Sequence, residues 1–149
     1  MAGKYPPLGP ERRYDSNFAI VPFSRTYDEA FILLVEARNY LAWNLKNDRR
    51  NLNGGLRLAQ FREEMRMTTR LIRAMAWLLS VRAVDAGEIG WDEAVDIDDL
   101  MVDLKICIED RRDECVMTPP ALLDLMERAQ ALYMRVARME LQVAARCAP

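Results

Sequence analysis

The sequence lacks histidine altogether among its 149 residues. Histidine is the usual general base near neutral pH and the commonest transition-metal ligand in proteins. Its absence excludes Ser-His-Asp and Cys-His catalysis, Cys/His zinc sites, and the Glu-x-x-His di-iron sites of helical bundles. A carboxylate or lysine with a perturbed pKa remains a route to proton transfer near pH 7. We therefore expect a protein that is not an enzyme and that needs no metal or cofactor.

Cysteines, long apolar runs and net charge are also scarce. The three cysteines, Cys107, Cys115 and Cys147, form no C-x-x-C motif, which favours free thiols over a disulfide framework or a zinc ribbon. No apolar run is long enough to span a bilayer, and the first 15 residues lack the apolar core of a signal peptide. A net charge of −2 argues against a general nucleic-acid binder. These features predict a soluble, cytoplasmic protein without membrane or nucleic-acid partners.

What the sequence does contain is helical periodicity. Hydrophobic residues make up 51% of the chain, which is enough to form the core of one domain. Strand signals are almost absent, so we predict an all-α fold: an antiparallel bundle of three long helices plus a short connecting helix. Prolines are frequent in residues 1–23, which predicts an extended N-terminal arm. Residues 24–146 then form the helical bundle domain, and residues 147–149 form the C-terminal end.

The first and last long helices have recognisable starts. The string TYDE predicts a capping box with Thr26 as N-cap, and this helix should end near Asn47. The string TPP predicts Thr118 as N-cap and Pro119 as the first helical residue of the last helix, which should end near Arg146. The apolar residues of this last helix recur at intervals of four and three, as in a bundle seam: Leu125, Ala129, Leu132, Val136, Met139 and Val143.

The middle helix should be the longest, from about Leu56 to Ala86, with Gly87 in the left-handed conformation after its end. One apolar stripe along this helix is predicted to face the core of the bundle. The stripe consists of Leu58, Phe61, Met65, Ile72, Met75, Leu79 and Ala83.

A second apolar side begins beyond Arg73, where the polar face of the same helix fades. Trp77, Leu78 and Val81 occupy this side. A helix that is apolar all round is normally buried all round, so a second subunit is a candidate to cover it. Interior core remains the alternative. We predict a homodimer with Trp77, Leu78 and Val81 at the subunit contact, because Trp is favoured at the centres of interfaces.

An arginine ladder runs along the same helix. Arg62, Arg66, Arg70 and Arg73 fall within about 80° of one another at 100° per residue. The ladder is either solvated or paired within the chain, a docking surface for an acidic partner, or a nucleotide site. No Gly-rich loop precedes it, as phosphate recognition would favour. We predict a partner surface and keep a small-ligand or nucleotide sensor as the alternative function.

An acidic connector follows the middle helix. Residues 85–104 carry eight acidic side chains and no basic one. Asp96, Asp98 and Asp99 superficially resemble a calcium loop, but the glycine and glutamate spacing that such a loop requires is missing. We expect a solvated connector with a short helix from Trp91 toward Asp96, followed by the polar loop EDRRDECV.

Two strings together resemble the RcdA family of alphaproteobacterial regulators of CtrA degradation: FSRTYDEAFILLVEARNYLAW and EEMRMTTRLIRAMAWLLSVRAVDAGEIGWDEA. The resemblance covers Phe23 to Val143 and contains no catalytic motif. It implies an all-helical, dimeric adaptor without enzymatic activity, which helps deliver cell-cycle regulators, including the transcription factor CtrA, to the ClpXP protease. The partners that it implies are a small response regulator and a cyclic-di-GMP-binding effector protein.

Overall fold

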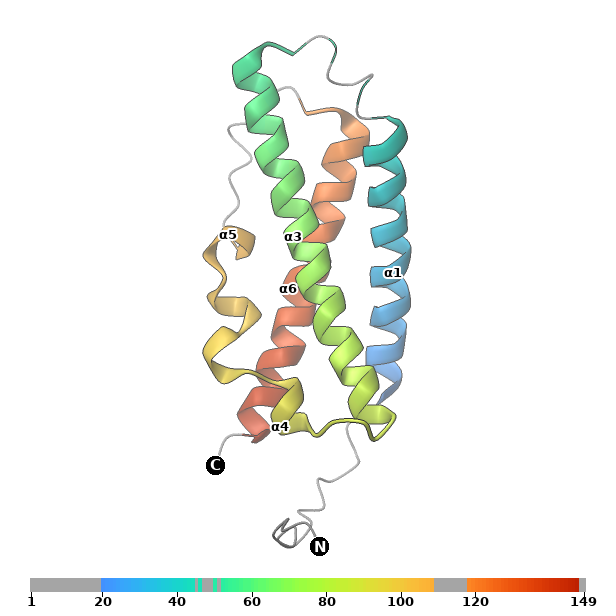
Figure 1. Cartoon of the computed structure of the whole chain (residues 1–149), viewed down its shortest axis with the longest axis vertical. Coiled ribbons are helices and arrows are strands. Elements are labelled where there is room, and N and C mark those ends of the chain that lie inside the picture. Colours follow the sequence, from blue (N-terminus) through green and yellow to red (C-terminus); the bar gives the residue numbers. More distant parts are fainter. Residues whose placement is uncertain (1–19, 45, 47–49, 51, 109–117, 148–149) are drawn as a thin grey trace, which may run out of the picture.

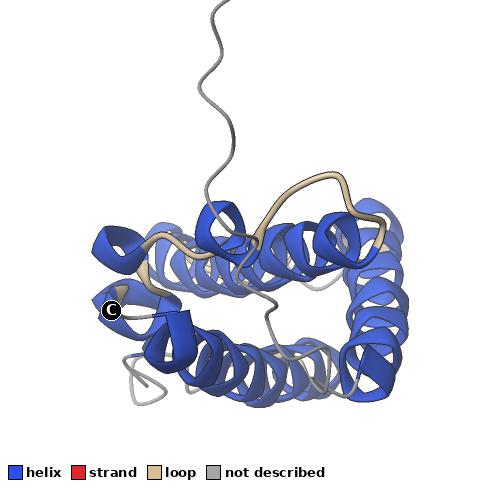
Figure 2. Ribbon diagram, turned by 90° about the horizontal axis from the view of Figure 1, so that it is seen from below, coloured by secondary structure: helices blue, strands red, loops and turns tan. Residues whose placement is uncertain are grey.

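The computed structural model describes residues 20–44, 46, 50, 52–108 and 118–147. Three long helices form the body of the molecule: α1 (Ile20–Trp43), α3 (Gly54–Asp85) and α6 (Pro120–Cys147). Four short segments connect α3 to α6: α4 (Trp91–Ala94), η1 (Ile97–Asp99), η2 (Met101–Asp103) and α5 (Lys105–Ile108). Helices and loops account for all of the described chain, which contains no strand (Figure 2). The predicted all-α bundle is therefore confirmed.

The long helices do not all alternate in direction. Arg128 of α6 pairs with Glu36 of α1, whereas Arg135, further along α6, pairs with the earlier Glu29, so these two helices are antiparallel. Helix α1 is likewise antiparallel to α3 (Figure 1). Helices α3 and α6 run in the same direction, and the segment from α4 to α5 leads from the lower end of α3 back to about the middle of the bundle (Figure 1). This connector occupies the position that a fourth helix would take beside α3 and α6.

The first helix begins earlier than the sequence suggested. Helix α1 starts at Ile20, so the last four residues of the predicted arm are helical, and residues 1–19 lie outside the described chain. Pro22 is tolerated there because the first turn of a helix does not need its backbone N–H groups. Thr26 is buried inside α1, so the predicted capping box is wrong. The helix ends at Trp43 rather than near Asn47.

The end of α3 agrees with the sequence. Gly87 has a φ of 75°, the left-handed conformation predicted for it. Its N–H donates to the carbonyl oxygen of Val84 (3.0 Å), and the N–H of Glu88 donates to that of Ala83 (2.9 Å). These two bonds make a Schellman motif, which satisfies carbonyl groups that the helix end would otherwise leave without donors.

The starts of α3 and α6 differ slightly from the predictions. The Asn53 side chain accepts a hydrogen bond from the backbone N–H of Leu56 (2.9 Å) and so caps α3 two residues earlier than expected. The carbonyl group of Pro119 accepts the first bond of α6, and Pro120 is its first helical residue, one position later than predicted. The predicted polar loop, residues 109–116, lies outside the described chain.

The core lies between the three long helices and under the connector. Helix α6 contributes the largest share of fully buried side chains, and its predicted seam is confirmed except at Met139, which is half-buried. None of the described helices combines the length and the apolar character needed to cross a bilayer. The fold therefore packs one long helix, α3, against α6, α1 and the connector, and leaves one side of α3 open.

Candidate interaction surface

The residues predicted at a subunit contact lie on the inner face of α3, the face that packs in the core. Trp77, Leu78 and Val81 are only 5%, 1% and 4% exposed within a single chain. The ring of Trp77 packs edge-on against that of Phe23 in α1, with 5.8 Å between the ring centroids. The chain's own core therefore accounts for the apolar character of these three residues, and no second subunit is needed to cover them.

The opposite face of α3 is apolar and exposed. The prediction that the stripe on this face points into the core is wrong, since only Met75 of that stripe is buried. Its other large side chains lie on the outside, with these exposed fractions: Leu58 52%, Phe61 46%, Met65 42%, Ile72 55% and Leu79 50%. We call these five residues the outer seam of α3.

The spacing within the outer seam is that of a coiled coil. Leu58, Met65, Ile72 and Leu79 follow one another at intervals of seven residues, the repeat of helices that pair with other helices. At 1.5 Å per residue the seam extends over about 30 Å of the helix axis. The hydroxyl group of Thr69, which lies between Met65 and Ile72, donates to the carbonyl oxygen of Met65 (2.8 Å) and so adds little polarity.

Polar side chains of α3 are turned inward instead. Gln60, Glu63, Glu64 and Arg70 are all buried. The side-chain amide of Gln60 donates to Glu64 (3.1 Å) and Glu63 accepts from Arg66 (2.7 Å), so buried polar groups of α3 have hydrogen-bond partners inside the bundle. Isolated apolar side chains on a surface are ordinary, whereas an apolar seam along one helix face is a candidate interaction surface.

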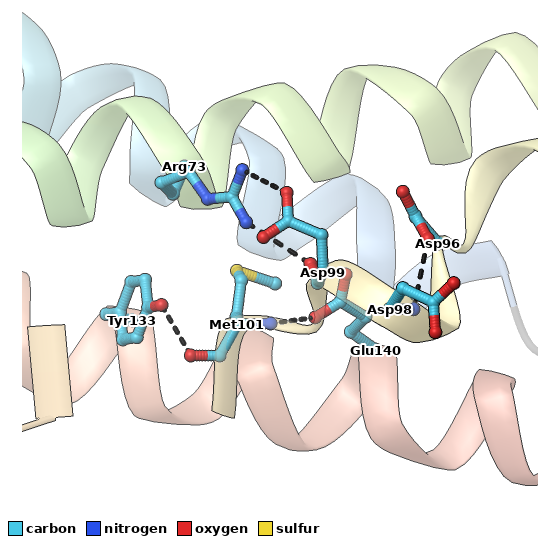
Figure 3. A network of polar contacts seen from close by, with 7 residues as sticks. All are labelled: Arg73, Asp96, Asp98, Asp99, Met101, Tyr133 and Glu140. Carbon is cyan, nitrogen blue, oxygen red and sulfur yellow. Dashed lines mark hydrogen bonds and ion pairs between the residues drawn. The ribbon is translucent and has the colours of Figure 1, made fainter. Parts of the chain in front are cut away.

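Two members of the arginine ladder hold the connector in place. The Arg70 Nε group donates to the carbonyl oxygen of Cys107 (2.7 Å). The Arg73 guanidinium donates to the carboxylate of Asp99 (3.0 Å) and to the carbonyl oxygen of the same residue (3.2 Å), as Figure 3 shows. The bond to Asp99 is the main cause of a raised pKa for Arg73. These arginines thus tie α3 to the connector across 37 and 26 positions of sequence.

The other two members of the ladder differ from each other. Arg66 pairs with Glu63 one turn earlier (2.7 Å), and its side chain is only 11% exposed. Arg62 is exposed. Of the alternatives that the sequence left open, pairing within the chain therefore describes three of the four arginines. A nucleotide sensor would need those same groups for phosphate, so the structure does not favour that function.

Helix α6 holds the connector from the other side. The backbone N–H of Met101 donates to the Glu140 carboxylate (2.7 Å), and the Tyr133 hydroxyl donates to the carbonyl oxygen of Met101 (2.6 Å), as Figure 3 shows. Burial raises the pKa of Glu140 and of Tyr133. Neither role is predicted from the sequence. The detectable signal was Glu140 itself, an acidic residue on the otherwise apolar inner face of α6.

The acidic residues of the connector serve local structure. Asp96 accepts a hydrogen bond from the backbone N–H of Asp98 (3.0 Å), and Asp99 pairs with α3, so the expectation of a fully solvated connector holds only in part. Within the described ranges, no group of three potential metal ligands comes together. Cys107 is buried, which raises the pKa of its thiol, and Cys147 is half-buried; both are free thiols, and Cys115 lies outside the described chain.

Comparisons with known proteins agree with this fold. No curated protein sequence matches the chain. The crystal structure of RcdA from Caulobacter crescentus CB15 matches with a TM-score of 0.63 and 28% sequence identity, over 82% of this chain and 91% of that chain. The resemblance to RcdA that the sequence motifs suggested is therefore confirmed. A family model described as "Protein of unknown function (DUF1465)" matches residues 15–149. Since the match spans most of the chain, this protein belongs to the DUF1465 family.

Proposed function

We propose that this protein is a non-enzymatic, cytoplasmic adaptor that delivers cell-cycle regulators such as CtrA to the ClpXP protease. The adaptor acts by tethering, which raises the effective concentration of cargo near the protease without any chemistry. Its partners in this role are a small response regulator and a cyclic-di-GMP-binding effector protein. The similarity to RcdA supports the role, and the outer seam of α3 is the observation that carries it, because an adaptor needs surfaces that bind other proteins.

The proposal includes a homodimer in which the outer seams of two copies pair. A surface with a heptad repeat fits another helix with the same repeat, and the α3 helix of a second copy provides one. A two-fold dimer uses the same patch twice, so the pairing closes and leaves no seam exposed. Trp77, Leu78 and Val81 then support the interface from behind, because they anchor the inner face of α3 in the core.

Arg62 is the arginine best placed to contact an acidic partner. It is exposed and follows Phe61 of the outer seam directly, so it lies at the edge of that surface. Charged residues at the rim of an apolar interface mainly affect association rate and partner choice. We propose that Arg70 and Arg73 contribute to partner binding through the connector that they hold, rather than by direct contact. Arg66 would contribute through Glu63 of α3, with which it pairs.

The decisive assay for the adaptor role is reconstituted proteolysis. Purified CtrA, ClpXP and the two accessory partners are combined with and without this protein, and the half-life of CtrA is followed. We expect a shorter half-life with the protein present. An unchanged half-life, with every partner present, would reject the adaptor role. Sedimentation of the protein alone tests the dimer independently, since a monomer at all concentrations would reject the pairing of the seams.

A further inference from the structure

An open groove of about 430 Å³ lies where α1 ends and α6 begins. This end of the bundle is at the top of Figure 1. The volume is within the range of about 300–1,000 Å³ typical of ligand sites. The lining residues come from both helices: Glu36, Asn39, Tyr40, Trp43, Asn44, Ala121, Asp124 and Leu125. None of them belongs to the outer seam of α3, so the groove is a separate feature of the surface.

The groove has an exposed aromatic wall. Trp43 is the last residue of α1, and 78% of it is exposed, the highest fraction among the large hydrophobic residues of the described chain. Tyr40, one turn earlier, is only 5% exposed and so is anchored in the bundle. An indole ring that is held on a helix but open to solvent offers its negative face to a cation.

The groove also carries excess negative charge. Glu36 and Asp124 both bond to the single guanidinium of Arg128, at 2.6 and 3.2 Å. The bond to Arg128 lowers the pKa of Glu36, so this carboxylate is ionised at neutral pH. The two carboxylates and one guanidinium leave one net negative charge. The last turn of α1 contains no basic residue to offset the negative end of the helix dipole. Of the described residues that follow α1, the cations Lys46 and Arg50 are exposed and are not among the residues that line the groove; Arg49 lies outside the described chain.

We propose that this groove binds a peptide segment of a partner protein in which a lysine or arginine stands next to an apolar residue. The cationic side chain lies over the Trp43 ring, close to the carboxylates of Glu36 and Asp124. The neighbouring apolar side chain packs against Tyr40 and Leu125. The charge of the groove matches a basic segment and disfavours an acidic one. Because the groove and the outer seam use different helix faces, this binding does not depend on the dimer or on delivery to a protease.

A peptide selection tests the proposal. A random library of 12-residue peptides displayed on phage is selected against the immobilised full chain. The enriched peptides are then synthesised with a fluorophore and titrated with the protein by fluorescence anisotropy. We expect the enriched peptides to contain a lysine or arginine beside an apolar residue. Failure to enrich peptides, or enrichment of peptides without a basic residue, would overturn the proposal.

Four variants locate the site. Trp43→Ala should weaken peptide binding by at least about two- to fivefold. Trp43→Phe should weaken it less, because a phenyl ring retains part of the attraction for a cation. Glu36→Gln should also weaken binding. Glu29→Gln is the matched control: it removes the equivalent α1–α6 ion pair, Glu29 to Arg135 at 2.6 Å, two turns away and outside the groove. The affinity of the Glu29→Gln variant for the peptide should equal that of the wild-type protein.

Two results would show that the groove has another role. Unchanged affinity in both Trp43→Ala and Glu36→Gln would place the peptide elsewhere on the protein. A shift of the monomer–dimer equilibrium in Trp43→Ala, measured by sedimentation, would assign the groove to a second copy of this chain. Either result overturns the proposal. The adaptor role would stand, because it is tested by the half-life of cargo and not by peptide affinity.

Discussion

A substitution in the outer seam of α3 should weaken the proposed dimer without unfolding the monomer. Ile72 lies in the middle of the heptad repeat, between Met65 and Leu79, and is 55% exposed in a single chain. Replacing it with glutamate puts a carboxylate at the centre of the proposed interface. The same replacement changes little in the monomer, because substitutions at exposed positions usually alter the free energy of unfolding by no more than about 0.5 kcal/mol.

The expected loss of dimer stability follows from the exposed fraction. Full burial of an isoleucine side chain stabilises by about 1.5–3 kcal/mol, so covering the exposed half of Ile72 contributes about 1 kcal/mol. A two-fold dimer contains two copies, which gives about 2 kcal/mol. Each introduced carboxylate also loses water without gaining a partner, at a cost of at least about 1 kcal/mol per copy. The sum of about 4 kcal/mol corresponds to roughly a thousandfold increase in the dimer Kd.

Sedimentation velocity over a concentration series measures this increase. Leu141→Glu is the control, since Leu141 is 45% exposed on α6 and lies outside the seam. We expect the control to sediment as the wild-type protein does, and both variants to keep the wild-type circular dichroism spectrum. Pairing through the outer seam is refuted if Ile72→Glu dimerises as the wild-type protein does, or if Leu141→Glu weakens the dimer as strongly as Ile72→Glu.

Three further predictions concern the fold itself. Trp77→Ala should lower the free energy of unfolding by about 3–5 kcal/mol in urea, because it removes a buried ring from the monomer core. Gly87→Ala should cost about 1–2 kcal/mol, measured in the same way, because φ is 75° and this conformation is strained for alanine; beyond residues 86–88, no atom lies within 4 Å of the added methyl group. Burial raises the pKa of Glu140 above its ordinary value of 4.5, so the folded state holds this proton more tightly than the unfolded chain. The resulting stabilisation is complete below pH 4.5 and is lost as the pH rises through the raised pKa. The control is Glu140→Gln, which keeps an acceptor for the N–H of Met101. Urea unfolding from pH 4 to 7 should show the wild-type protein losing stability relative to this variant as the pH rises. If the pKa of Glu140 is not raised, the two proteins will show the same pH dependence.

Helix α6 shows what sequence periodicity predicts well. It has one apolar face, and the residues at the predicted seam positions are buried in the structure, with Met139 half-buried. The Schellman motif at Gly87 was predictable for a related reason, since the left-handed conformation is a property of a glycine and its nearest neighbours. Thr26 shows the limit of such local signals. Its capping box is plausible in isolation, but α1 continues back to Ile20, because the chain packs Phe23 against Trp77.

Helix α3 could not be oriented in the same way, because two of its faces are apolar. Periodicity identifies which residues share a face, but it does not say which face meets the rest of the protein. The sequence predicts that the Leu58 to Leu79 face packs in the core and that the Trp77 face forms a subunit contact. The structure places the Trp77 face in the core and leaves the other exposed. The proposed subunit contact therefore moves to the Leu58 to Leu79 face, which the structure leaves exposed.

The amino-acid sequence alone predicts the number of long helices, the end of α3, the inner face of α6 and the resemblance to RcdA. These properties depend on residues close together in the chain, or on the order of motifs along it. Three features follow only from the three-dimensional structure: the orientation of α3, the partners of the arginines, and the parallel course of α3 and α6. Each depends on contacts between residues far apart in the chain, such as Arg70 with Cys107 and Met101 with Glu140. The energies of such contacts cannot be read from a local sequence pattern.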